Sequence, residues 1–212
     1  MSDVLLRYDK EKVYTFIDCE TLNLCLSFCH NLPWQISMIK VQGDECIDSK
    51  DFYVKWKTDL KISKEAARIT KYSEAKVQKL GLPPEEVFPT VNDWLQNCDH
   101  IVGHNVLGFD IYLIRGLYNL MGEDYKPLVK KIIDTNCIAR GIKGGEPHPP
   151  HEDFLEYQYR VMNKIKKGLR TGLGPLSKEY NIEHDYDKLH NALVDLQLNV
   201  KLWNKLKWQI EL

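Results

Sequence analysis

One short segment near the N-terminus constrains the fold more than any other. Residues 13–17 are aromatic, apolar or β-branched, and two carboxylates, Asp18 and Glu20, follow at a spacing of two. Such a run favours a buried β-strand. Because side chains alternate along a strand, both carboxylates would project from the same face. Two anions at the end of a buried strand are costly unless a cation lies between them, so the segment indicates a divalent metal site.

The composition is typical of one globular domain covering residues 1–212. The chain is 43% hydrophobic and 28% charged, which suits a full core. The net charge of -1 provides no overall basic field, so nucleic acid would need a local basic groove. We find no long apolar run and no signal-peptide core, and therefore expect no membrane contact and a reducing, cytoplasmic location. The six cysteines are then expected to be buried thiols rather than disulfides.

The pattern of apolar and polar residues predicts the order of the elements. After the first strand we expect strands at 35–41 and 52–56, forming an antiparallel meander, and at 100–104 and 132–134. Capping residues and apolar stripes predict helices at 63–69, 83–97, 109–121, 152–167, 176–180 and 191–206. A stretch rich in glycine, proline and histidine predicts a loop at 140–150. The fold class is therefore α/β, with a mixed central sheet flanked by helices.

Two of these helices carry an acid on an apolar stripe. Asp110 lies on the stripe of Leu113 and Leu117, and Asp195 lies on the stripe of Leu198. Either acid alone could lie half-exposed at a helix start, where the helix dipole favours negative charge. Together with the pair on the first strand, one shared pocket is the simpler explanation.

Three short motifs carry a resemblance to a known family. They are, in chain order, Asp18-Cys19-Glu20-Thr21, Asn105-Val106-Leu107-Gly108-Phe109-Asp110 and His190-Asn191-Ala192-Leu193-Val194-Asp195. They resemble the exonuclease motifs of the DEDD superfamily, and the last is similar to its histidine-bearing DEDDh branch. That branch contains proofreading exonuclease subunits, ribonuclease T and oligoribonuclease. The resemblance covers about residues 13–203, includes Asp134 after a later strand, and implies a ribonuclease-H-like fold.

The resemblance implies a metal-dependent 3′–5′ exonuclease. Asp18, Glu20, Asp110 and Asp195 are the expected catalytic carboxylates and metal ligands. Oxygen ligands without a thiolate suit two Mg²⁺ ions, with Mn²⁺ as a substitute, better than Zn²⁺. Two such ions about 3.5–4 Å apart can hold the attacking and leaving oxygens of an in-line displacement. His190 is the expected general base for the attacking water, because an imidazole can accept a proton at neutral pH.

Residues beside the motifs are expected to bind the substrate. By resemblance, Thr21 and Leu22 hold the terminal nucleotide with Leu22 against its base, and Asn105 lies beside it. Phe109 would also lie there, although plain packing is favoured for this side chain. A basic cluster could follow the phosphate backbone or be an ordinary solvated face, and comprises Lys143, Lys164, Lys166, Lys167, Arg170 and Lys188. The 140–170 segment looks expanded, which suggests a lid or a partner site.

The sequence thus predicts a single domain that removes nucleoside 5′-monophosphates from single-stranded 3′ ends. DNA is favoured over RNA, and a polymerase partner, with a proofreading role, is left open. One alternative is a 3′–5′ exoribonuclease or oligoribonuclease with the same site. Another is an inactive nucleic-acid-binding module of the same fold. The last is a zinc module built from Cys25, Cys29 and His30, or from His148 and His151.

Overall fold

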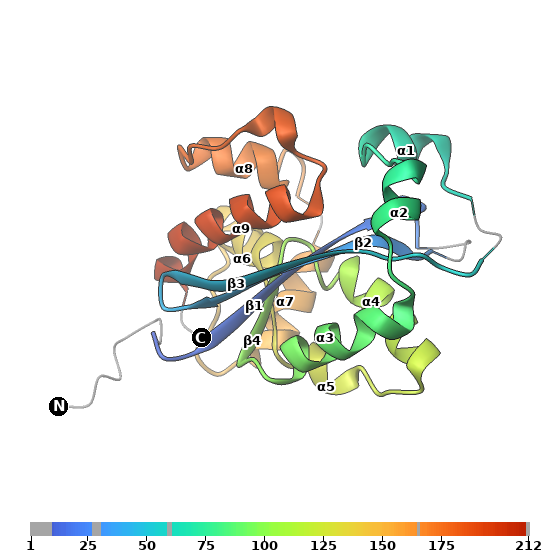
Figure 1. Ribbon diagram of the computed structural model, residues 1–212. Helices are drawn as coiled ribbons and strands as arrows, with labels where there is room; N and C mark the ends of the chain where they lie inside the picture. Colours follow the sequence, from blue (N-terminus) through green and yellow to red (C-terminus); the bar gives the residue numbers. More distant parts are fainter. Residues whose placement is uncertain (1–9, 27–30, 59–60, 165, 211–212) are drawn as a thin grey trace.

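The central sheet places the first motif on its middle strand. The computed structural model describes residues 10–26, 31–58, 61–164 and 166–210 (Figure 1). Within these ranges the sheet has the order β3-β2-β1-β4-β5, and its strands are β1 (Val13–Thr21), β2 (Pro33–Gln42), β3 (Glu45–Tyr53), β4 (His100–Gly103) and β5 (Ile132–Asp134). β1, β2 and β3 form an antiparallel meander, whereas β4 runs parallel to β1 and β5 runs parallel to β4. The predicted mixed sheet is confirmed.

Helices cover both faces of this sheet, as Figure 1 shows. The longest of the described helices, α9, packs on β1 and β2 with α6 and α8 beside it, while α4 contacts β1 from the other face and packs on α3. The helices are α1 (Lys64–Ile69), α2 (Glu74–Leu80), α3 (Pro84–Gln96), α4 (Asp110–Met121), α5 (Lys126–Val129), α6 (Thr135–Gly144), α7 (Phe154–Asn163), α8 (Leu173–Glu179) and α9 (Ala192–Leu206), with 3₁₀ turns η1 (Tyr186–Lys188) and η2 (Lys207–Gln209).

Alternation along β1 divides the core into two clusters. Tyr14 and Phe16 belong to the cluster that contains the apolar stripe of α9. Ile17 and Cys19 belong to the cluster on the opposite face, with the buried residues of α3 and α4. Because side chains alternate with period two, Asp18 continues the face of Tyr14 and Phe16 toward α9. The strand therefore directs its carboxylates toward the helix that carries the third motif.

The predicted third strand at 52–56 was wrong in its start and its end. β3 begins at Glu45, directly after a turn in which Gly43 has φ of +59°, and it ends at Tyr53. Its first five residues are exposed because it forms the edge of the sheet, so no apolar alternation marks them. Val54 lies outside β3, in an isolated bridge to Leu82.

The predicted loop at 140–150 was wrong in its first half, because α6 continues to Gly144. Asp134 caps the start of this helix, and Gly145, in a left-handed conformation, ends it. Gly141 lies where α6 and α7 approach closely, since a Cβ there would overlap the Tyr157 hydroxyl. The glycines that predicted a loop serve helix packing and termination instead. Two boundaries also differ: α7 ends at Asn163, and α8 begins at Leu173.

The cysteines agree with the expectation in part. Cys19, Cys98 and Cys137 are buried free thiols, whereas Cys25 and Cys46 are exposed. The sixth, Cys29, lies outside the described residues. In the part of the chain that the structure describes, no helix has both the length and the apolar character needed to span a membrane.

Candidate active site

Three carboxylates from two distant segments meet at the end of β1. One carboxylate oxygen from each of Asp18, Glu20 and Asp195 lies within 4.8 Å of the other two. Asp18 and Glu20 are opposite Ser37 and Gln35 of β2 in the strand register. Asp195 comes from the first turn of α9, which packs on the same strands. The geometry therefore brings together acids that are about 175 positions apart in the sequence.

Asp110 joins the group through the backbone of β1. It is the first residue of α4, and its Oδ1 accepts a hydrogen bond from the Cys19 amide at 2.9 Å. Cys19 is the residue between Asp18 and Glu20, so this bond fixes Asp110 beside both of them. Its carboxyl is 4% exposed, and burial raises its pKa to about 7. All four predicted carboxylates thus belong to one acidic centre, in which Glu20 and Asp110 are buried and Asp18 and Asp195 are half-buried.

A fifth carboxylate, Asp134, fixes the loop that precedes Asp110. Its Oδ1 accepts from the Asn105 amide at 2.9 Å, and its Oδ2 accepts from the Leu107 amide at 3.0 Å. The same carboxylate caps α6. Gln158 of α7 donates to Ile132 and accepts from the Asp134 amide at 2.6 Å. The sequence marks Asp134 only as a match at the end of a strand, and the loop that it orders becomes visible only in three dimensions.

His190 lies at the entrance to α9 with its side chain exposed. Its backbone has φ of +66°, and its amide donates to Asp195 Oδ2 at 3.2 Å. Asn191, the next residue, caps α9 by accepting from the Val194 amide. His190 is thus placed beside the acidic centre by the carboxylate that closes the third motif.

The electrostatics of the centre favour protons or cations. Burial, followed by repulsion from Asp195 and Asp110, raises the pKa of Glu20 to about 8. Burial and the same kind of repulsion raise the pKa of Asp18 well above its ordinary value. Burial raises the pKa of Asp195 to about 6. Each raised pKa indicates that the surrounding protein does not by itself stabilise the ionised form of the carboxyl.

The donor set fits a hard divalent ion. Asp195 Oδ1 is buried and has no hydrogen-bond partner among the described residues, although a buried carboxylate oxygen normally has one. One carboxylate oxygen from each of Asp18, Glu20 and Asp195 provides three oxygen ligands and no sulfur or nitrogen. Mg²⁺ and Mn²⁺ prefer such ligands. Asp18, Glu20 and Asp195 would therefore hold the metal, with Asp110 beside them.

The predicted substrate residues occupy different surroundings. Thr21 is buried, and its hydroxyl donates to the Asn23 carbonyl. Leu22 is 7% exposed and packs in a small cluster with Trp34. Asn105 has φ of +69°, and Phe109 packs partly buried against the core beside α4. The packing favoured for Phe109 is observed, and the nucleotide contacts of these four residues stay predictions.

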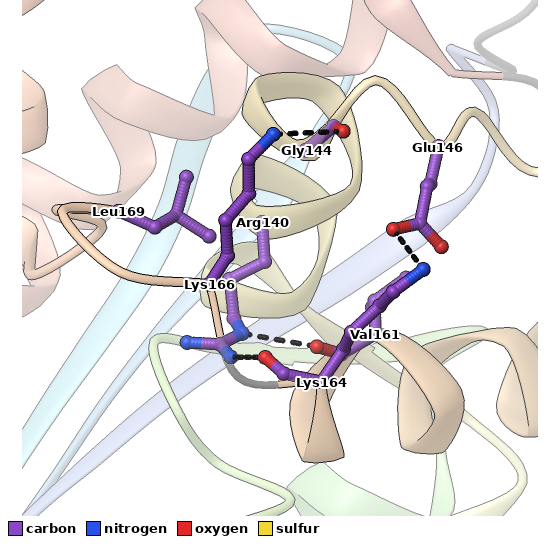
Figure 2. Close-up of a pocket in the computed structure, with 7 residues that line it drawn as sticks. All are labelled: Arg140, Gly144, Glu146, Val161, Lys164, Lys166 and Leu169. Carbon is purple, nitrogen blue, oxygen red and sulfur yellow. Dashed lines mark hydrogen bonds and ion pairs between the residues drawn. The ribbon is translucent and has the colours of Figure 1, made fainter.

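Most of the basic cluster is engaged within the protein. Arg140, Lys164 and Lys166 line a cavity of about 290 Å³ between the ends of α6 and α7 (Figure 2). Arg140 donates to the carbonyls of Val161 and Lys164, while Lys166 donates to the carbonyl of Gly144. Ion pairs join Lys164 to Glu146, Lys143 to Glu179 and Lys188 to Asp185. Lys143 also donates to the Arg170 carbonyl at 3.0 Å. Many of these cations therefore stabilise helix ends and turns.

The residues of the zinc alternative do not assemble within the described ranges. His148 Nε2 lies 2.7 Å from the Glu152 carbonyl oxygen, and its ring packs against Phe154 and Tyr157. Cys29 and His30 lie outside the described residues. The group found there with metal-binding geometry consists of carboxylates alone.

The fold and the acidic centre together define a class of protein. A mixed sheet with acids on its central strand and on two helices, in this chain order, defines the DEDD 3′–5′ exonucleases with a ribonuclease-H-like fold. The model of the RNase_T exonuclease family matches residues 15–203. The chain belongs to this family.

Two kinds of relative were found in addition. The chain is 22% identical over 205 residues to a PolC-type DNA polymerase III from Mycoplasma pneumoniae, covering 96% of this chain and 12% of the polymerase. It also resembles E. coli exonuclease I in complex with a 5cy-dT13 oligonucleotide, at 19% identity and a TM-score of 0.70. A complex of the same exonuclease with a dA16 oligonucleotide gives a TM-score of 0.73 at 19% identity.

The chain is much shorter than these relatives. In the first of these two complexes, the structural match covers 92% of this chain and 40% of exonuclease I. In the dA16 complex it covers 94% of this chain and 42% of exonuclease I. At these identities the structural likeness shows the fold. The activity, substrate and partners of this chain are therefore matters for proposal and experiment.

Metal should stabilise the protein most at alkaline pH. A carboxyl whose pKa is raised by folding stays protonated where the unfolded chain has lost its proton, so stability falls as pH rises through that window. For Glu20 the window extends from its ordinary pKa of 4.5 to about 8. In chelator, we expect the melting temperature to fall between these pH values. At pH 8, saturating Mn²⁺ should raise it by roughly 5–10 °C.

The control for this measurement is the Glu20→Gln variant, which lacks the titrating group. Its melting temperature in chelator should depend less on pH than that of the unsubstituted protein, and Mn²⁺ should raise it less. Equal stabilisation of both proteins at pH 5 and pH 8 would contradict a metal site at these carboxylates.

Proposed function

We propose that this protein is a metal-dependent 3′–5′ exonuclease acting on single-stranded 3′ ends and releasing nucleoside 5′-monophosphates. The observation that carries the proposal is the convergence of Asp18, Glu20 and Asp195 within 4.8 Å, beside the buried Asp110. Such a centre is unfavourable without cations, and family membership supplies the reaction class. We further propose that residues 1–212 form one exonuclease domain.

Each carboxylate has a part in this reaction. Asp18, Glu20 and Asp195 would hold two divalent ions with their oxygens, and Asp110 would complete the site from the start of α4. Bound there, such ions would supply the positive charge that offsets the negative charge developing at the phosphate. The protein contributes fixed positions, because β1 is held in the sheet on both sides and Asp110 is bonded to its backbone. This pre-organisation is the usual means by which such a site lowers the barrier.

His190 acts as the general base in the proposed mechanism. His190 is exposed and its amide bonds to an acid of the centre, so we assign its ring to taking a proton from the attacking water and passing it to solvent. An imidazole suits this role because its ordinary pKa lies close to neutral pH. Its amide bond to Asp195 keeps the backbone of the base in a fixed relation to one metal ligand.

DNA is the substrate that the relatives favour. The PolC-type relative is a DNA polymerase, and the exonuclease I structures hold 5cy-dT13 and dA16 oligonucleotides. Contacts to the terminal nucleotide are assigned to Thr21, Leu22 and Asn105, with Phe109 supporting them from the core. A polymerase partner would follow from the same relative.

Matched single-stranded DNA and RNA oligomers, labelled at the 5′ end, test this proposal. With Mn²⁺ or Mg²⁺ we expect a ladder of products shortened from the 3′ end, and faster shortening of DNA than of RNA. Chelator should abolish the ladder, and a 3′-phosphate should block it. Faster digestion of RNA would identify an exoribonuclease with the same site. No digestion of either strand at any metal concentration would favour an inactive binding module.

A further inference from the structure

One peptide group beside the acidic centre is held at both ends by charged side chains. Lys71 Nζ donates to the Leu189 carbonyl oxygen at 3.1 Å and to the Asp187 carbonyl oxygen at 3.0 Å. The His190 amide donates to Asp195 Oδ2 at 3.2 Å. The Leu189 carbonyl and the His190 amide belong to the same peptide group. This group therefore lies between a cation and an anion.

The cation comes from a distant part of the chain. Lys71 lies in the turn between α1 and α2, 118 residues before Leu189. In Figure 1 these two helices stand beside the end of the sheet where β1 ends and β2 begins. Lys71 thus links the α1–α2 segment to η1 and the residues that follow it, on the other side of the site. Its charge also lies close enough to Asp195 to offset part of the rise in pKa that burial causes in that carboxyl.

The backbone conformation at this peptide group is rare in chains where no contact holds it. His190 has φ of +66° and Lys71 has φ of +54°, and neither residue is a glycine. Such a conformation persists only where neighbouring contacts hold it. Hydrogen bonds to charged groups are about twice as strong as neutral ones, so the two ends of this peptide group provide that restraint.

We propose that Lys71 is a positioning residue for His190. This inference rests on the proposed exonuclease function, in which His190 is the general base. Lys71 does not need to touch the substrate, because it acts through the peptide group that it holds. Asp195 uses Oδ2 for this peptide group and leaves Oδ1 buried and unpaired for metal. The contacts that Lys71 and Asp195 make with this peptide group, here called the clamp, therefore set the position of His190 relative to a proposed metal ligand.

The clamp can be removed without disturbing the core, because Lys71 is exposed. Lys71→Met keeps the length of the side chain and removes its charge and donors. With saturating metal, we expect kcat for 3′-nucleotide release to fall about 10- to 100-fold, since small misplacement of a base is costly. KM should stay within about twofold. Lys71→Arg, which retains a donor, should recover part of the loss, and Lys79→Met on the exposed face of α2 should leave both constants unchanged.

A double substitution separates positioning from other roles. In a His190→Ala background the base is absent, so adding Lys71→Met should cause little further loss. An additional loss equal to that of the single variant would overturn the proposal, because Lys71 would then act independently of His190. A rise in KM with kcat unchanged would also overturn it and would assign Lys71 to substrate binding.

A readout that does not depend on activity is hydrogen exchange at residues 186–191. The His190 amide and its neighbours should exchange faster in Lys71→Met than in the unsubstituted protein, while Lys79→Met should leave exchange unchanged. Unchanged exchange in Lys71→Met would overturn the clamp. If the unsubstituted protein showed no exonuclease activity, the proposed function would fail, yet this comparison would still decide whether Lys71 holds the peptide group.

Discussion

Replacing Asp18 with Asn should lower the rate of nucleotide release by at least about 10³-fold and leave a folded protein. Asp18 lies on the central strand, within 4.8 Å of oxygens from Glu20 and Asp195. An amide keeps the shape of the side chain but removes the charge that binds a cation. Initial rates on a labelled single-stranded oligomer, at saturating Mn²⁺, measure the loss.

The same variant should be more stable than the unsubstituted protein in chelator at pH 8. Its side chain no longer carries the charge that burial and repulsion from Asp110, Glu20 and Asp195 disfavour. The matched control is Asp93→Asn, an exposed acid on α3, which should change neither activity nor stability appreciably. Retention of more than a tenth of the activity in Asp18→Asn would place the metal elsewhere.

Replacing His190 with Ala should lower kcat at neutral pH by about 10²- to 10⁴-fold. The proposed role of His190 is proton transfer, and the residues that would bind metal are all carboxylates, so metal affinity should survive. Titration with Mn²⁺, followed by calorimetry or by the melting temperature, measures that affinity separately from turnover. His151→Ala, at an exposed histidine remote in sequence from the third motif, is the control.

The two measurements give His190 distinct outcomes. Loss of turnover with unchanged Mn²⁺ affinity supports a general base. A collapse of Mn²⁺ affinity would make His190 a ligand and would contradict the assigned role. Unchanged turnover would show that another group accepts the proton.

The acids of the site could be predicted because each one conflicts with its local surroundings. Asp110 and Asp195 lie on apolar helical stripes, and Asp18 and Glu20 end a strand that is otherwise buried. Charge in such places needs a cation, a partner or a proton, and this requirement is readable from spacing alone. The strands and helices around the motifs were predicted well for a related reason, since their buried faces produce regular periods.

The features that sequence reasoning missed are those that depend on distant contacts. The start of β3 is exposed on the sheet edge and carries no apolar period, so only its pairing with β2 defines it. The basic residues at 164–170 look like a surface for phosphate, yet Lys164 pairs with Glu146 and Lys166 binds a helix end. The contacts of Lys71 could not be predicted from the sequence, because its carbonyl partners are more than 110 residues away.

Asp134 connects parts of the molecule that seem unrelated in the sequence. It receives amides from the second motif and from α6, and its own amide is held by Gln158 of α7. A substitution in α7 can therefore displace Asp110 through this chain of hydrogen bonds without approaching a nucleotide. The residues that determine the geometry of the acidic centre thus extend beyond the four acids, and they include Gln158 of the peripheral helix α7.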